Sequence, residues 1–221
     1  MLSIIIPTLN EAEVIEHCLN DLQELKNAGN EIIVVDGRSK DNTVDLARPL
    51  SSQLIVSEPA RSTQMNIGAR HAKGKFLLFL HADTTLPENI DQLIALINKN
   101  EKTWGRFDVR LTNDAWWYRV IELCMNQRSR ITGIATGDQA IFVHKMLFTE
   151  IDGFPELPLM EDIAISKMLN KISRPVCLHS KVSSSSRRWE KNGVIRTILK
   201  MWLFRLVYFF GYDASKLAQR Y

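Results

Sequence analysis

Polar side chains that suit phosphate or metal chemistry follow each of four short apolar runs near the start of the chain. These residues are Thr8, Asn10 and Glu11 after the first run, Asp36 after the second, Arg61 after the third, and His81 and Asp83 after the fourth. Short apolar runs of this kind are typical of buried strands. Because parallel strands end at one edge of a sheet, where α/β proteins bind ligands, we expect these side chains to share one crevice.

Asp83 is the candidate metal ligand, since its carboxylate comes directly after the fourth apolar run. A carboxylate there can bind Mg²⁺ or Mn²⁺ while the metal keeps coordination sites open for a diphosphate. His81 could supply a second ligand or a hydrogen bond to a phosphate. The alternative for Asp83 alone is a turn or a helix cap, and an isolated histidine is more often structural.

Two further positions suit a nucleotide. Asp36 could accept hydrogen bonds from a ribose or a base, although turn formation with Gly37 explains the same residue. Arg61, with Asn66 on the following predicted helix, could pair with a phosphate, or could lie on a solvated helix face.

A candidate general base lies much later in the chain, at Glu161-Asp162. A carboxylate that follows a loop and faces a crevice can accept a proton from a hydroxyl group. Two acidic residues before an apolar helix also favour its positive N-terminal end, so a structural role stays open. Arg187-Arg188-Trp189 joins a forked cation to an aromatic ring, which suits a diphosphate and a sugar, or an exposed basic turn.

The elements that would position these residues alternate between strand and helix. We expect strands over residues 3–6, 31–36, 54–56 and 76–80, and helices over 14–25, 43–48 and 62–72 and from Pro87 onward. Asn10 would cap the first helix, with Glu13 completing a capping box. This order predicts an α/β fold with a mostly parallel central sheet flanked by helices.

The order is less regular after residue 100. We expect strands over 107–111 and 140–143, helices over 116–130 and 161–169, a polar link over 182–186 and a helical segment over 193–212. In that last segment apolar side chains alternate with Arg196, Lys200 and Arg205. Such a helix would pack on the domain or on a second subunit, or would lie in a membrane interface.

Composition limits the class of protein. The chain has 221 residues, 45% of them hydrophobic, and a formal net charge of +3, which suits one globular domain and gives no reason to expect a nucleic-acid partner. Three widely spaced cysteines indicate reduced thiols in a cytoplasmic protein. Pro7 interrupts the apolar start, so we expect no signal peptide, and no apolar run is long enough to span a membrane.

Taken together, the motifs resemble those of the inverting family 2 glycosyltransferases with the GT-A fold. Residues 4–11, which include Pro7, are similar to the start of the donor site, and residues 34–43 are similar to the nucleoside-binding stretch. Residues 78–83 occupy the place of the Asp-x-Asp metal motif, 160–162 resemble the Glu-Asp catalytic motif, and 188–189 the Arg-Trp motif. The run 132–139 is typical of a bacterial subgroup.

The resemblance implies one GT-A-like domain over residues 1–190, with a nucleotide-sugar half at 1–100 and an acceptor half at 101–190, followed by a C-terminal helical appendage at 191–221. It implies transfer of a sugar, with a hexose expected, from a nucleotide sugar to an acceptor hydroxyl with inversion. Asp162 would be the base and Glu161 would orient it, with Mg²⁺ or Mn²⁺ at Asp83 and His81. The donor would contact Pro7, Thr8, Asn10, Glu11, Asp36, Arg61, Asn66, Arg188 and Trp189.

Some features depart from the family pattern. His81 replaces the first Asp of the metal motif, Gly37 the second Asp of the nucleoside stretch, and Ser184 the Gln of the processive motif, so we do not expect polymer synthesis. A lipid-linked acceptor at the inner face of the cell membrane is one option for the unknown acceptor. The alternatives are a nucleotidyltransferase, which would usually carry a Gly-rich phosphate loop after the first strand, and a non-catalytic nucleotide-binding protein.

Overall fold

The computed structural model describes residues 1–88, 90, 93 and 100–210. Within them, eight strands form one sheet in the order β3-β2-β1-β4-β7-β6-β8-β5. The strands are β1 (Leu2–Thr8), β2 (Glu31–Asp36), β3 (Gln53–Val56), β4 (Phe76–Phe79), β5 (Thr84–Thr85), β6 (Trp104–Leu111), β7 (Phe142–His144) and β8 (Val176–Ser184). Parallel pairs join β1 to β2 and β4, β2 to β3, and β6 to β8. The predicted α/β class with a mostly parallel sheet is confirmed.

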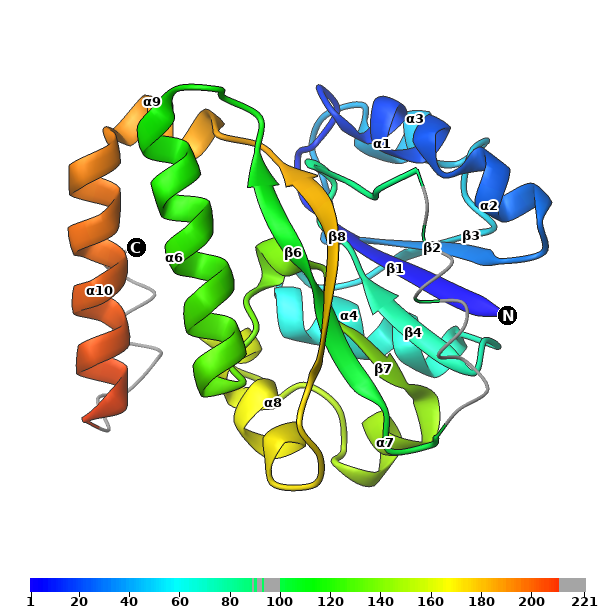
Figure 1. Cartoon of the computed structure of the whole chain (residues 1–221). Coiled ribbons are helices and arrows are strands. Elements are labelled where there is room, and N and C mark those ends of the chain that lie inside the picture. Colours follow the sequence, from blue (N-terminus) through cyan, green and yellow to red (C-terminus); the bar gives the residue numbers. More distant parts are fainter. Residues whose placement is uncertain (89, 91–92, 94–99, 211–221) are drawn as a thin grey trace.

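Helices cover both faces of this sheet (Figure 1). On one face, α1 (Ile15–Asp21), α2 (Gln23–Asn27) and α3 (Thr43–Ala47) accompany Ile4 and Ile6 of β1; on the other, α4 (Arg61–His71), α7 (Lys145–Glu150) and α8 (Glu161–Asn170) accompany Ile5. Successive β1 side chains point to opposite faces. Gly68 lets α4 approach β1, because a Cβ there would lie 2.4 Å from Ile5 Cγ2.

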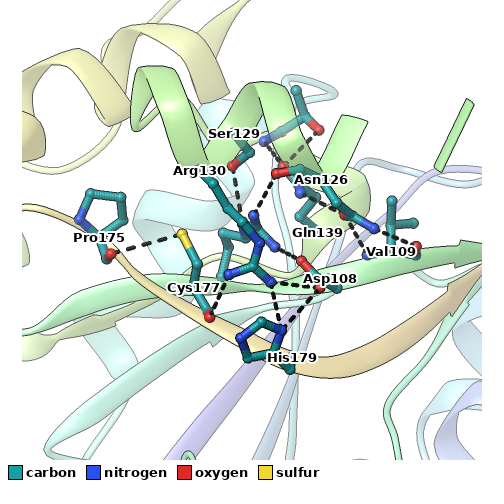
Figure 2. A network of polar contacts seen from close by, with 11 residues as sticks. Asp108, Val109, Asn126, Ser129, Arg130, Gln139, Pro175, Cys177 and His179 are labelled. Atoms are coloured by element: carbon teal, nitrogen blue, oxygen red, sulfur yellow. Dashed lines mark hydrogen bonds and ion pairs between the residues drawn. The ribbon is translucent and has the colours of Figure 1, made fainter. Parts of the chain in front are cut away.

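The later part of the chain continues the sheet and adds α6 (Trp116–Thr132), a 3-10 helix (Gly137–Gln139), α9 (Arg187–Asn192) and α10 (Val194–Phe209). A buried polar network joins α6 to β6 and β8 (Figure 2). Asp108 pairs with Arg106 and, over 2.6 Å, with Arg130. Arg130 also donates to the Cys177 carbonyl oxygen over 3.2 Å. These charged hydrogen bonds fix the helix against the two strands.

Three local predictions were wrong. Helix α1 begins at Ile15, not after Asn10, because Asn10 adopts a left-handed conformation (φ 55°) and its side chain accepts a hydrogen bond from the Lys40 amide. The helix expected over 14–25 is divided at Leu22 into α1 and α2. The expected polar link belongs largely to β8, since Val182 is fully buried and pairs with Val109. The helix expected from Pro87 falls mostly outside the described residues.

Candidate functional site

A cavity of about 300 Å³ lies where β1 and β4 end, between the 3-10 helix, the start of α8, and α10. Its lining brings together most of the side chains predicted from the sequence: Pro7, Glu11, Arg61, His81, Asp83, Glu161, Asp162 and Trp189. Of the side chains expected to share one crevice, Glu11, Arg61, His81 and Asp83 line this cavity, whereas Thr8, Asn10 and Asp36 do not. Gly137, Asp138 and Arg205 line the same cavity.

Asp36 is fully buried and is not among the residues that line the cavity. Its carboxylate accepts hydrogen bonds from Thr8 Oγ1 (3.2 Å), from the Ser39 hydroxyl (2.5 Å) and from the Ser39 amide (2.8 Å). Asp36 and Thr8 also face each other in the β1–β2 register. These contacts fix the two loops that follow β1 and β2, which is the turn-forming alternative for Asp36.

Asn10 and Glu11 continue that link between the loops. The Asn10 amide donates to Ser39 Oγ over 2.8 Å, and the Glu11 amide donates to Thr43 Oγ1 over 2.8 Å. Because their backbone is held in this way, the Glu11 side chain is directed to the cavity that it lines.

Glu11 and Asp83 form the acidic side of the cavity. Burial raises the pKa of Glu11, and the Asp83 carboxylate raises it further, while the Arg187 and Arg61 cations act in the opposite direction. Arg187 Nη2 lies 4.0 Å from Asp83 Oδ2, and the Asp83 side chain keeps 32% of its surface exposed. A cation placed between the two carboxylates would relieve their repulsion.

His81 faces the turn that contains Gly137 and Asp138. Its Nδ1 lies 3.6 Å from Asp138 Oδ1. A Cβ on Gly137 would lie 2.5 Å from both Cε1 and Nε2 of the imidazole, so the glycine backbone packs directly on the ring. The structure thus gives His81 a clear packing role in addition to its place in the cavity.

Glu161 and Asp162 begin α8 after Met160, which has a left-handed conformation (φ 68°). Asp162 accepts hydrogen bonds from the Gly137 amide at Oδ2 (3.1 Å) and from the Ile163 amide at Oδ1 (2.7 Å). Glu161 is buried and lies 3.8 Å from Arg61 Nη1. Burial and the neighbouring Asp162 raise the pKa of Glu161, and Arg61 opposes that shift.

The remaining predicted residues have different settings. Asn66 holds the loop before α8 by exchanging two hydrogen bonds with the Phe154 backbone, of 2.8 and 2.9 Å, and is not part of the cavity lining. Trp189 lines the cavity but is 7% exposed, because it packs with Leu111 and Tyr118. Arg188 belongs to α9, and its side chain lies outside the described part.

Sequence reasoning missed several side chains of this cavity. Helix α10 contributes Thr197, Met201, Phe204 and Arg205 to the lining. These four fall on one helical face, and that spacing was the available signal.

Among the described residues, no group of three or more acidic, histidine or cysteine side chains is arranged to hold a metal ion. In that same part of the chain, no helix has the length and apolar character needed to cross a bilayer. The cysteines at 18, 124 and 177 are free thiols.

Comparison with known sequences gives one clear family. The glycosyl transferase family 2 model matches residues 3–151. A PGL/p-HBAD biosynthesis glycosyltransferase from Mycobacterium tuberculosis is 36% identical over 128 residues, which cover 52% of this chain and 50% of that protein. Glycosyltransferase AglE from Haloferax volcanii is 33% identical over 90 residues, covering 37% and 30%. The chain thus spans about half the length of the first relative.

Solved structures agree on the fold. TarS from S. aureus superposes with a TM-score of 0.68 at 22% identity, covering 84% of this chain and 60% of that one. The mannosyltransferase PcManGT from Pyrobaculum calidifontis, in complex with GDP-Man and Mn²⁺, gives a TM-score of 0.63 at 21% identity, covering 83% and 56%. These similarities confirm the expected GT-A-like fold.

Proposed function

The chain belongs to glycosyl transferase family 2, and we propose that it transfers a hexose from a nucleotide sugar to an acceptor hydroxyl with inversion of the anomeric carbon. The observation that carries this proposal is the shared cavity of Asp162 and Asp83. One carboxylate can accept the acceptor's proton, and the other can hold the cation that faces a diphosphate.

Asp162 acts as the general base in this proposal. The amides of Gly137 and Ile163 each bind one of its oxygens, so the carboxylate has a fixed orientation in the cavity wall. It removes the acceptor proton as the hydroxyl attacks the anomeric carbon from the side opposite the diphosphate. A single displacement of this kind inverts the configuration and needs no covalent sugar intermediate. Glu161, paired with Arg61, orients the start of α8.

Asp83 is the main residue for a divalent cation. Mg²⁺ and Mn²⁺ suit sites with one or two protein ligands, because phosphate and water oxygens complete their coordination. Asp83, with Glu11 beside it, would supply one or two carboxylate ligands of this kind. The two carboxylates also repel each other, and a cation bound by them would relieve that repulsion. His81 contributes less as a ligand in this scheme, because its ring packs against the Gly137 backbone and its Nδ1 lies 3.6 Å from Asp138 Oδ1. When bound, the cation neutralises charge on the departing diphosphate.

Arg187 and Arg61 supply cations to the diphosphate. Arg61 lines the cavity, and Arg187 Nη2 lies 4.0 Å from Asp83 Oδ2; both cations lower the pKa of Glu11 against the effect of burial. Forked guanidinium groups match the geometry of phosphate oxygens. Arg188 and Trp189 remain proposed donor contacts, and so do Thr8, Asn10, Asp36 and Asn66, whose roles in this structure are to hold the surrounding loops.

A nucleoside diphosphate sugar is the proposed donor. Structures of TarS contain UDP and UDP-GlcNAc, and PcManGT contains GDP-Man with Mn²⁺. The nucleoside would lie over the linked β1 and β2 loops, where the Asn10 and Glu11 backbone forms the rim. The division into a nucleotide-sugar half, an acceptor half and a C-terminal segment stays a prediction, and residues of all three line the cavity.

We also propose that α10 brings the enzyme to the cytoplasmic face of a membrane, where a lipid-linked acceptor would be available. Seven large apolar side chains of its outer surface are at least half exposed, namely Ile195, Leu199, Trp202, Leu203, Leu206, Phe209 and Phe210. Exposed Arg196 and Lys191 lie close to them in sequence and would attract anionic headgroups. Burial of the same surface in a homodimer is the competing outcome, which liposome binding and oligomeric state distinguish.

Release of nucleoside diphosphate from a panel of nucleotide sugars, with and without Mn²⁺, tests the proposed function. If release of the nucleoside diphosphate depends on Mn²⁺ and the sugar is set free or transferred, the result supports glycosyl transfer. Release of inorganic diphosphate in a parallel reaction with a nucleoside triphosphate and a sugar 1-phosphate would instead identify a nucleotidyltransferase. Nucleotide binding without any turnover would leave only a binding protein.

A further inference from the structure

Helix α10 has two faces with different surroundings. The outer face is exposed and apolar, whereas the inner face places Thr197, Met201, Phe204 and Arg205 in the wall of the cavity. Tyr208 continues this inner face, and burial together with the nearby Asp162 raises its pKa. The predicted appendage is therefore part of the site, on the side of the predicted base.

Arg205 lines the cavity together with Asp162 and Asp138. The charges of these two carboxylates oppose the effect of burial on the pKa of Arg205. The pKa of Glu11 is instead shifted by Asp83 and Arg187, where the proposed cation and diphosphate would bind. Arg205 is therefore grouped with Asp162, which the proposed function places at the acceptor end.

A second arginine, Arg128, lies near Arg205. Arg128 of α6 has two side-chain nitrogens, Nε and Nη2, that are sealed from solvent and lack a hydrogen-bond partner. Burial, followed by the charge of Arg205, lowers the pKa of Arg128 to about 10, and burial likewise lowers that of Arg205. In the described part of the chain, neither arginine has a carboxylate within 4.0 Å.

Two partly buried guanidinium groups without close anionic partners are costly to the free protein. A negatively charged ligand group would offset that cost, and the forked geometry of arginine suits phosphate and carboxylate oxygens. Only Arg205 reaches the cavity, so it would touch the ligand, and Arg128 would strengthen the positive potential behind it.

We propose that Arg205, supported by Arg128, forms a subsite for an anionic group on the acceptor, so that the acceptor is a hydroxyl compound carrying a phosphate or carboxylate. This inference rests on the proposed function, because it takes the Asp162 side of the cavity as the acceptor end. The anion would hold the acceptor with its hydroxyl next to Asp162.

The test uses the full chain with UDP and Mn²⁺ present, so that the diphosphate position is filled. Glycerol 3-phosphate is titrated and the melting temperature recorded, with uncharged glycerol as the matched ligand. Glycerol 3-phosphate is expected to raise the melting temperature, and glycerol at the same concentration to have no comparable effect. Arg205→Gln should weaken the apparent affinity at least tenfold and Arg128→Gln severalfold, whereas Arg174→Gln, at an exposed position outside the cavity lining, should keep it.

An equal shift in Arg205→Gln and the wild type, or no shift in the wild type, overturns the proposal. If Arg205→Gln does not fold, Arg205→Met replaces it, because methionine keeps a long flexible side chain and removes the charge; unchanged affinity there also overturns the proposal. Failure to bind UDP counts against the proposed donor and not the anion subsite, which is then titrated without nucleotide.

The source of the anion is separated by a second ligand. Dihexanoyl phosphatidic acid below its micellar concentration carries the same phosphate on a lipid. Tighter Arg205-dependent binding of the lipid identifies a lipid-borne acceptor, and equal binding identifies a soluble one. Arg205-independent binding of both contradicts the subsite.

Discussion

The backbone amide of Gly137 donates a hydrogen bond of 3.1 Å to Asp162 Oδ2, while a Cβ on Gly137 would overlap the His81 ring at 2.5 Å. One residue thus links the predicted base to the histidine of the predicted metal motif. The two motifs are far apart in sequence, and the turn at Gly137 sets their relative position.

Gly137→Ala should therefore displace the His81 ring and disturb Asp162. Overpacking of this kind typically costs about 1–3 kcal/mol of stability, and we expect turnover to fall at least tenfold. Chemical denaturation and nucleoside diphosphate release measure the two effects. The matched double variant Gly137→Ala/His81→Ala should regain most of the lost stability, because it removes the ring that the new methyl group meets. If the double variant loses as much stability as the two single variants together, or more, then the clash with the His81 ring is not the cause of the stability loss in Gly137→Ala.

Asp83→Ala should abolish the effect of Mn²⁺ on donor binding, whereas His81→Ala should lose only part of it. The reason is that Asp83 supplies the hard oxygen ligand, while the His81 ring is packed on the Gly137–Asp138 turn. Isothermal calorimetry with and without EDTA measures the difference. If EDTA does not change the donor affinity of the wild type, the proposed metal site is contradicted.

Glu11→Gln should raise the melting temperature in the absence of divalent metal. Because burial and Asp83 raise the folded-state pKa of Glu11 above its ordinary 4.5, keeping it ionised destabilises the fold. This penalty is absent below the unfolded pKa, grows as pH rises through the interval up to the folded pKa, and is complete above it. Melting curves of both proteins across this pH range check the sign. Mn²⁺ should reduce the difference in melting temperature between the two proteins. If Glu11→Gln is less stable than the wild type at neutral pH without divalent metal, the prediction is contradicted.

Trp202→Glu and Phe209→Glu should prevent flotation with anionic liposomes without lowering the melting temperature. Both side chains are largely exposed, 68% and 73%, so a charge there opposes insertion but leaves the core intact. Such substitutions are preferable to removing α10, because truncation would also open the cavity. Met146→Glu, at an exposed position on α7, is the control. Wild-type protein that stays unbound at low salt would favour a subunit contact for this surface.

Much of the site could be predicted because it depends on strand ends. The runs that became β1, β2 and β4 are apolar on both faces, so they had to lie in the middle of a covered sheet, and the residues after them had to converge. The same reasoning could not decide what Asp36 binds. Its partners Thr8 and Ser39 satisfy it within the protein, which only the loop conformations reveal.

The parts that escaped prediction depend on packing between distant segments. β8 was missed because its polar side chains, such as Ser184, are buried by contacts with β5 and β6. The inner face of α10 was missed because helical spacing shows that Arg205 shares a face with Met201, but not that this face meets the cavity of Asp162. The apolar residues of α10 predicted a membrane or subunit contact, and they gave no indication that the opposite face of the helix lines the cavity.

Asp162→Asn provides the most direct test of the central claim that Asp162 is the base. The substitution keeps the shape of the side chain and removes its ability to accept the proton, at the loss of one backbone hydrogen bond. Calorimetry of donor binding is compared with turnover, using the nucleotide sugar that most raises the melting temperature and Asp114→Asn, at an exposed carboxylate, as control. We predict that donor affinity stays within about threefold and that turnover falls by roughly 10²–10⁴, the usual contribution of a general base. Near-normal turnover in Asp162→Asn would contradict the account.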